Sequence, residues 1–129
     1  MLLSYRLGFV ASILAISWLA IAEPVSFSPK GLINDKILHF LCFAYLTILF
    51  KFSRFTDQDF WVYVIVLGYG ILIEIAQMYI PYRSFEFFDI LADLMGIFCA
   101  SLFLKLAKDF YASYWINIIK PYITFNLLI

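Results

Sequence analysis

Hydrophobic runs separated by short polar segments recur along the whole chain. They predict helices over about residues 7–22, 37–52, 60–80 and 87–104. These runs approach the roughly 20 residues that an α-helix needs to cross the hydrocarbon core of a bilayer. Pro81 directly follows the third run and predicts its end. The pattern therefore predicts an all-α fold, an integral membrane bundle of four transmembrane helices.

The first run also has a second interpretation. It ends in Ala20, Ile21 and Ala22, an A-x-A pattern typical of the cleavage site of a signal peptide. Against cleavage, the run is long for the apolar region of a signal peptide, and Arg6 alone supplies positive charge before it. We predict a retained first span, with cleavage as the alternative.

The C-terminal tail, residues 109–129, differs from the four runs. It is rich in tyrosine, carries little charge and is interrupted by Pro121. This composition favours an interfacial segment lying on the membrane, with a poorly inserted fifth span as the alternative. Because we find no internal repeat, low-complexity tract or linker, we expect residues 1–129 to form a single domain.

Composition supports a membrane location. The chain has 129 residues, of which 65% are hydrophobic and only 14% charged, so a water-soluble fold could not bury its apolar surface. Nine basic residues balance nine acidic ones and form no basic stripe, which gives no support for a nucleic acid partner. Cys42 and Cys99 lie in apolar runs without metal-binding spacing, and we interpret them as free thiols. The expected partner is the lipid bilayer.

The distribution of basic residues predicts the orientation. With the N-terminus in the cytoplasm, six basic residues lie on the cytoplasmic side and three on the outer side. The cytoplasmic set is Arg6, Lys51, Arg54, Lys105, Lys108 and Lys120, and the outer set is Lys30, Lys36 and Arg83. We therefore predict a multi-pass protein with both termini in the cytoplasm.

Polar residues converge at one membrane face. In four alternating spans, the start of the second, the end of the third and the start of the fourth all reach the same side. Within each helix these residues are three or four apart and share a face. The resulting candidate polar cleft consists of Asp35, Lys36, His39, Glu74, Gln77, Arg83, Asp89 and Asp93.

Each of these residues also has a purely structural interpretation. Arg83 and Lys36 can serve as anchors at the level of the lipid headgroups. Glu74 lies roughly 10 Å below the end of its helix and can act as a protonated hydrogen-bond partner between helices. His39 is a candidate proton acceptor or an orienting hydrogen-bond partner. Gly96 is expected to permit close helix packing.

These residues resemble the VanZ-like family of membrane proteins. The resemblance covers roughly residues 7–104 and rests on two blocks, DKxxHF and ExxQ with a Pro-x-Arg turn and DxxxDxxG. They stand here as Asp35, Lys36, His39 and Phe40, and as Glu74, Gln77, Pro81, Arg83, Asp89, Asp93 and Gly96. The family commonly has Asn in place of Asp93 and glycine in place of Ala100. The resemblance implies the fold, a location in the bacterial cytoplasmic membrane, and an association with low-level resistance to the glycopeptide teicoplanin.

The leading functional hypothesis is a cell-envelope protein whose outward polar cleft binds a lipid-linked or amphiphilic ligand. Arg83 and Lys36 would contact an anionic group, and no cofactor or metal is expected. The alternative is an intramembrane hydrolase or transferase acting on a lipid phosphate, with His39 as base and carboxylates as acids or metal ligands. A proton relay through Glu74, His39 and Asp93 and a purely structural cluster are two further alternatives. The sequence does not identify catalytic residues.

Overall fold

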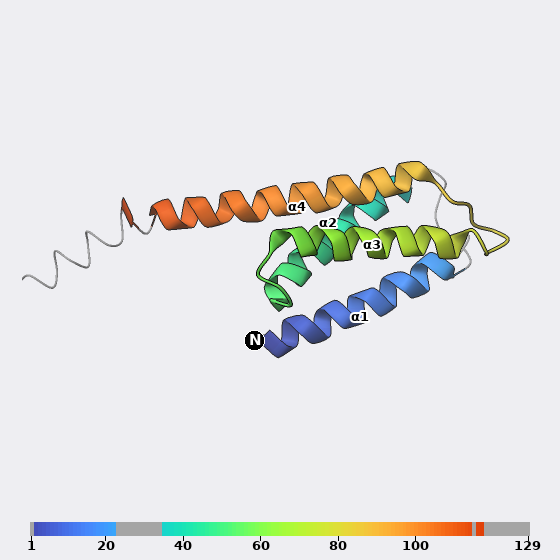
Figure 1. The fold of residues 1–129 in the computed structure, drawn as a ribbon, viewed down its shortest axis with the longest axis horizontal. Coiled ribbons are helices and arrows are strands. Elements are labelled where there is room, and N and C mark those ends of the chain that lie inside the picture. Colours follow the sequence, from blue (N-terminus) through green and yellow to red (C-terminus); the bar gives the residue numbers. More distant parts are fainter. Residues whose placement is uncertain (1, 23–34, 115, 118–129) are drawn as a thin grey trace, which may run out of the picture.

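Four α-helices make up most of the protein (Figure 1). The computed structural model describes residues 2–22, 35–114 and 116–117. The helices are α1 (Leu2–Ile21), α2 (Asp35–Ser53), α3 (Asp59–Gln77) and α4 (Phe87–Tyr114). By length and composition, all four can cross a membrane. The prediction of an all-α bundle with four membrane-spanning helices is confirmed.

The helix ends differ from the predicted ones at three places. α1 begins at Leu2, before the apolar run, because nothing in the first residues interrupts a helix. α3 ends at Gln77, and tight turns through Tyr79 and Ile80 then lead to Pro81. α4 continues beyond Leu104 to Tyr114, with no proline or glycine to stop it. Residues 23–34, in the segment between the first two hydrophobic runs, and residues 118–129 of the predicted tail lie outside the described residues.

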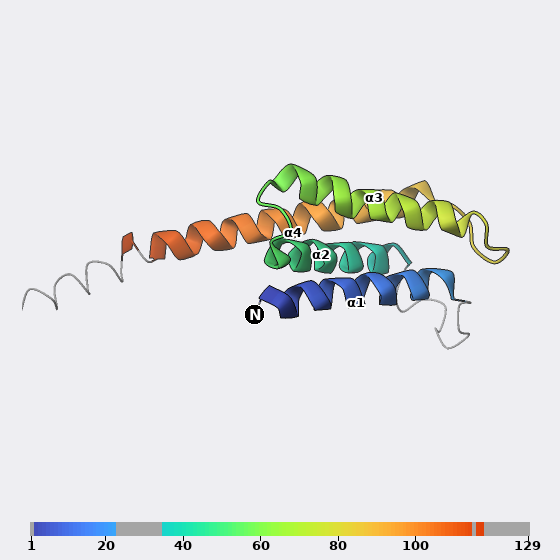
Figure 2. The same cartoon turned by 60° about the horizontal axis from the view of Figure 1, so that its bottom comes forward.

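In Figure 1, α2 and α3 lie between α1 and α4, and Figure 2 shows α2 between α1 and α4 with α3 farthest from α1 in that view. α1 contacts α2 and α3, α4 contacts the same two helices, and the α2–α4 contact is the most extensive. Successive helices run in opposite directions, and the far end of α4 projects beyond the other three (Figure 1). The 28 residues of α4 span about 42 Å, against about 28 Å for the 19 residues of α3.

The core lies where α2, α3 and α4 face one another. It contains Phe43, Leu46 and Phe50 from α2, with Val66 of α3 and Ile97 of α4 among the residues packed against them. α1 has no buried residue and covers this core from one side. Most large apolar side chains on the outer faces are exposed, as expected for helices that face lipid.

The end of the bundle near Leu2 is joined by polar and aromatic contacts. The Arg6 Nε donates to the Ser53 carbonyl oxygen at 3.1 Å, and its guanidinium lies 5.3 Å from the centre of the Phe55 ring. Lys51 at the end of α2 pairs with Asp59 at the start of α3, with Nζ 3.1 Å from Oδ1. These contacts fix the turn between α2 and α3.

Candidate functional site

His39 lies at the centre of a polar cluster at the opposite end of the bundle. Its Nδ1 is 2.9 Å from Oδ1 of Asp93, which joins α2 to α4. Asp93 is completely buried. An ionised carboxylate only accepts hydrogen bonds, so an ionised Asp93 requires the proton of a neutral His39 on Nδ1 and leaves Nε2 as an acceptor. An ionised Asp93 would thus orient the imidazole and leave Nε2 as the available nitrogen.

Two glycines make room for this contact. A Cβ at Gly96 would overlap the backbone oxygen of Phe40 and lie 3.0 Å from the backbone nitrogen of Ala44. α4 therefore approaches α2 backbone to backbone, one turn beyond Asp93. At Gly70 of α3, a Cβ would meet Oδ2 of Asp93. The small residues on α3 and α4 are what allow a carboxylate to reach His39 from a neighbouring helix.

The Nε2 edge of His39 is directed at two further carboxylates. It lies 3.8 Å from Oδ2 of Asp89 and 4.0 Å from Oε1 of Glu74. One ligand atom each from Asp35, His39 and Asp89 lie within 4.8 Å of one another, a spacing that a metal ion could bridge. Carboxylate oxygens and imidazole nitrogen suit a divalent cation. An imidazole held by a carboxylate on its far nitrogen is also the usual arrangement of a metal-ligating histidine.

Glu74 is fully buried at the same level. Its Oε2 accepts a hydrogen bond from the backbone N–H of Glu86 at 3.0 Å. Its Oε1, like Oδ2 of Asp93, is buried without a hydrogen-bond partner among the described residues. A buried carboxylate oxygen without a donor costs free energy, so these two atoms are where a proton, a cation or a ligand donor would be stabilised.

Lys36 is engaged by carboxylates from the start of α4. Its Nζ lies 2.7 Å from Oε2 of Glu86 and 3.3 Å from Oδ1 of Asp89. The ammonium group of Lys36 holds the pKa of Glu86 below its ordinary value. Glu86 was missed as a site residue by sequence reasoning, although its position directly before the fourth hydrophobic run placed it at the same membrane face. Lys36 is therefore largely neutralised by the protein itself.

Arg83 and Gln77 turn away from the carboxylates and toward α1. The Nη2 of Arg83 donates to the backbone oxygens of Leu19 and Ala22, at 3.4 and 3.3 Å, and Nε2 of Gln77 donates to that of Ala20 at 3.1 Å. These are terminal carbonyls of a helix, which attract positive charge. Within the described part of the chain, Arg83 forms no ion pair, and its Nε is buried without a hydrogen-bond partner.

A cavity of about 290 Å³ lies between α1, α2 and α3 beside this cluster. Its polar side is formed by Asp35, His39, Gln77 and Arg83. The remaining wall is apolar and consists of Ile16, Leu19, Ala20, Ala22, Leu38, Cys42, Phe43 and Ile73. From here on we call this cavity the polar cleft; it is lined by four of the eight residues predicted for such a cleft, because Lys36, Glu74, Asp89 and Asp93 do not line it. Both cysteines, including Cys42 in this wall, are free thiols.

The structure thus divides the eight residues predicted from sequence into two groups. Six lie together around the imidazole of His39, with Glu86 as an additional member: Asp35, Lys36, His39, Glu74, Asp89 and Asp93. Gln77 and Arg83 line the polar cleft but bind α1. Nothing in the sequence distinguished an arginine that pairs with carboxylates from one that binds helix carbonyls.

Together, the fold and this cluster define a class of small multi-pass helical membrane protein with buried acidic residues around one histidine. The chain belongs to the VanZ/LLP1 family, whose sequence profile matches residues 4–108. It is 36% identical over 74 residues to an uncharacterized protein of the yeast Schizosaccharomyces pombe. That alignment covers 54% of this chain and 46% of the relative, so the chain spans less than half of that protein. No solved structure matches the chain.

Proposed function

We propose that this protein binds a lipid-linked or amphiphilic molecule in its polar cleft. The observation that supports this most directly is the composition of the cleft, which has a polar side at the membrane face and a longer apolar wall. A molecule with an anionic group and a hydrocarbon chain matches both parts. Arg83, with no ion pair among the described residues, supplies the positive charge.

The two basic residues take different parts in this proposal. Arg83 directs its unpartnered Nε to an anionic group while its Nη2 remains on the carbonyls of α1. Lys36 is already paired with Glu86 and Asp89, so it positions those carboxylates and does not contact the ligand directly. The sequence led us to expect that both Arg83 and Lys36 contact the ligand. Because Lys36 is paired with carboxylates, we now assign this contact to Arg83 alone.

The resemblance to the VanZ-like family supports a role in the cell envelope. We propose that the protein resides in a bacterial cytoplasmic membrane, with both termini in the cytoplasm and the polar cleft facing outward, and that it lowers susceptibility to teicoplanin. The bacterial location and the orientation rest on the resemblance and on the basic-residue count. The relative reported above is from a yeast and gives no support to the bacterial location.

The test is the growth-inhibitory concentration of teicoplanin, with vancomycin as comparison, in a Gram-positive host that expresses the wild type, Arg83→Ala or Arg54→Ala. Arg54 lies at the opposite end of the bundle, outside the polar cleft, and serves as the control for loss of an arginine. At matched membrane levels, we expect the wild type and Arg54→Ala to protect selectively against teicoplanin, and Arg83→Ala not to. Equal susceptibility with and without the wild type would refute the resistance role.

Ligand binding is tested separately from resistance. The wild type and Arg83→Ala are purified in the same detergent, and the lipids that remain bound are identified by mass spectrometry. We expect an anionic amphiphile on the wild type that is depleted in Arg83→Ala and retained in Arg54→Ala. Identical lipid profiles in all three would contradict binding through Arg83, whatever the susceptibility of the host.

The second candidate is a metal-dependent hydrolase or transferase acting on a lipid phosphate. The observation that favours it is the grouping of Asp35, His39 and Asp89, with His39 oriented by Asp93. A divalent cation held there would polarise a phosphoryl oxygen. These three residues would bind the ion, and Glu74 would lie close enough to exchange a proton at the same edge.

Metal binding is measured with purified protein and Mg²⁺ or Mn²⁺ by isothermal titration calorimetry. The enzyme candidate requires saturable binding by the wild type that is weakened at least about tenfold in Asp89→Asn, since one charged ligand is lost. It also requires lipid-phosphate turnover that stops with chelator and resumes with metal. Absence of saturable metal binding by the wild type would exclude this candidate and leave the ligand-binding proposal intact.

A further inference from the structure

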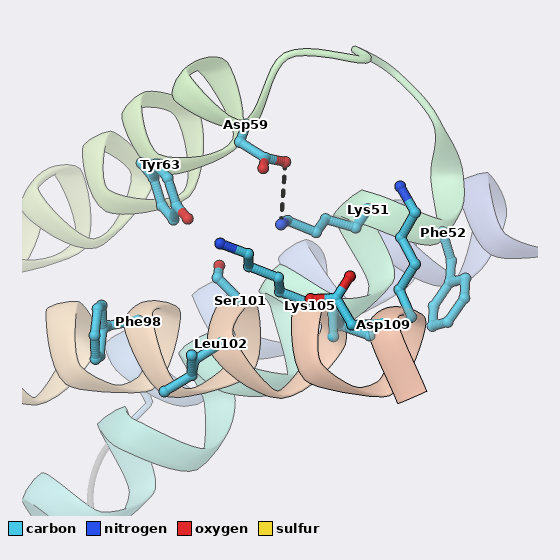
Figure 3. Close-up of a pocket in the computed structure, with 11 residues that line it drawn as sticks. Lys51, Phe52, Asp59, Tyr63, Phe98, Ser101, Leu102, Lys105 and Asp109 are labelled. Carbon is cyan, nitrogen blue, oxygen red and sulfur yellow. Dashed lines mark ion pairs between the residues drawn. The ribbon is translucent and has the colours of Figure 1, made fainter. Parts of the chain in front are cut away.

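We propose a second lipid site at the opposite end of the bundle, one that takes a membrane phospholipid with an anionic headgroup. It lies between α2, α3 and α4, far from His39, in a cavity of about 680 Å³ (Figure 3). Lys51, Lys105 and Lys108 line it together with Ser101, Tyr63 and Phe98. We call it the lysine groove. It is independent of the polar cleft and of the proposed function.

The described residues balance only part of the positive charge of the lysine groove, because three lysines face two aspartates there. Lys51 is paired with Asp59. Within the described part of the chain, no ion pair joins Lys105 or Lys108 to a carboxylate, although Asp109 also lines the groove. Figure 3 shows Lys105 pointing back toward Ser101 and toward the pair of Lys51 and Asp59. An anionic group at this position would contact an ammonium that has no ion-pair partner among the described residues.

Ser101 provides an independent indication of a ligand. It is only 6% exposed, yet its hydroxyl has no hydrogen-bond partner within the described residues. A serine or threonine inside a helix usually bonds to the carbonyl four residues earlier. Ser12, Thr47 and Ser53 all do so in this protein, each at 2.7 or 2.8 Å. The hydroxyl of Ser101 instead lies in the groove beside Lys105, where a phosphate oxygen could accept its hydrogen bond (Figure 3).

An apolar cavity continues from the lysine groove along the membrane-spanning part of α3 and α4. This second cavity, of about 720 Å³, shares Tyr63 and Phe98 with the groove. Leu67, Leu94 and Met95 are among its other lining residues. A polar end with cationic and hydroxyl donors followed by an apolar length matches a phospholipid whose acyl chain lies between α3 and α4. A soluble phosphate would use only the first of these two parts.

The length of α4 explains why the site exists. Lys105 and Lys108 lie on the part of α4 that extends past its predicted end at Leu104. This extension lets both lysines line the groove together with Lys51 at the end of α2 and Asp59 at the start of α3, at the level where headgroups are expected. The alternative is that Lys105 and Lys108 only extend into the headgroup region and interact with any anionic surface. That alternative would not explain the buried, unpartnered hydroxyl of Ser101 beside them.

The experiment compares binding of phosphatidylglycerol and phosphatidylcholine with identical acyl chains to the full chain in detergent, by native mass spectrometry. We expect the wild type to prefer phosphatidylglycerol. In Lys105→Gln/Lys108→Gln the preference should fall by about fivefold for each lysine removed, the usual effect of a lysine near an anionic surface. Arg54→Gln removes a charge at the same end of the bundle without lining the groove and should keep the preference.

Two further measurements locate the lipid. Ser101→Ala should weaken phosphatidylglycerol binding although no charge changes, and Cys99→Trp should do so by filling the apolar cavity from an exposed position. Glycerol phosphate at millimolar concentration should not displace the lipid, because it lacks the acyl chain. Variants are compared only as monodisperse protein.

Three results would overturn the proposal. One is equal binding of both lipids by the wild type, and another is a loss in Arg54→Gln as large as in the double lysine variant, which would indicate diffuse charge. Displacement by glycerol phosphate would assign the groove to a soluble phosphate.

Discussion

Replacement of Gly96 by alanine tests whether backbone contact between α2 and α4 builds the His39 cluster. The added Cβ would overlap the carbonyl oxygen of Phe40 and come within 3.0 Å of the backbone nitrogen of Ala44. Neither atom can rotate away, because both belong to the backbone of a helix. α4 must therefore move away from α2, and the 2.9 Å contact between His39 and Asp93 must lengthen with it.

The expected loss of stability follows from this overlap. Insertion of one methyl group into a packed interior costs about 1–3 kcal/mol, and contact with backbone on both sides places Gly96→Ala in the upper part of this range. In the opposite direction, alanine stabilises a helix relative to glycine by up to about 1 kcal/mol. A control with the same change in another helix removes this contribution. Gly68→Ala is the matched control, because it makes the same chemical change in α3 with nothing within 4 Å of the new Cβ.

Unfolding of both variants in mixed micelles with increasing sodium dodecyl sulfate gives the free energies to be compared. Gly96→Ala should be less stable than Gly68→Ala by about 1–3 kcal/mol. Equal stability of the two variants would refute the close approach of α2 and α4, and with it the geometry of the cluster.

Two further predictions use the same unfolding assay. Tyr69→Phe removes the hydroxyl that bonds Ser17 and the Ile13 carbonyl of α1, at 2.9 and 3.0 Å, and should cost about 0.5–1.5 kcal/mol. Tyr79→Phe, at a residue 83% exposed, should change stability much less, and equal losses would contradict a specific bond to α1. Asp93→Asn keeps an oxygen that can accept from His39, so it should destabilise less than Asp93→Leu, which leaves Nδ1 of His39 without its partner at a cost of about 1–3 kcal/mol. The reverse order would show that this hydrogen bond does not stabilise the fold.

The four helices and their order could be predicted from the sequence, because hydrophobic runs of this length are typical of membrane spans. α4 begins at Phe87, as predicted. The end of α4 was not predictable from hydrophobicity, because Lys105 and Lys108 mark where a helix leaves the apolar region and not where it stops. A helix continues into the polar region until a breaker ends it, and α4 reaches Tyr114 without one.

The convergence of polar residues was also predictable, since alternating spans bring particular helix ends to the same face. The partners within that face were not, because they depend on how each helix is rotated and how closely it packs. Gly70 of α3 illustrates this: its lack of a side chain makes room for Asp93, and no local pattern in the sequence links the two. Similarly, Arg83 binds α1 and Lys36 binds Glu86, a division that charge alone did not determine.

The hydrogen bonding of the cluster bears on whether it only fixes the packing of the helices. The contact of Tyr69 with Ser17 and the Ile13 carbonyl shows what a packing contact looks like in this bundle, because its hydroxyl is fully engaged by protein atoms. In contrast, Oε1 of Glu74 and Oδ2 of Asp93 are buried without a donor among the described residues. A carboxylate within a membrane costs free energy that only a proton, a cation or a ligand can offset where protein donors are missing. A packing cluster with both carboxylates ionised would be expected to satisfy these atoms internally, so ionised Glu74 and Asp93 would favour a site that binds a cation or a ligand, whereas protonated carboxyls would fit a cluster that only joins helices.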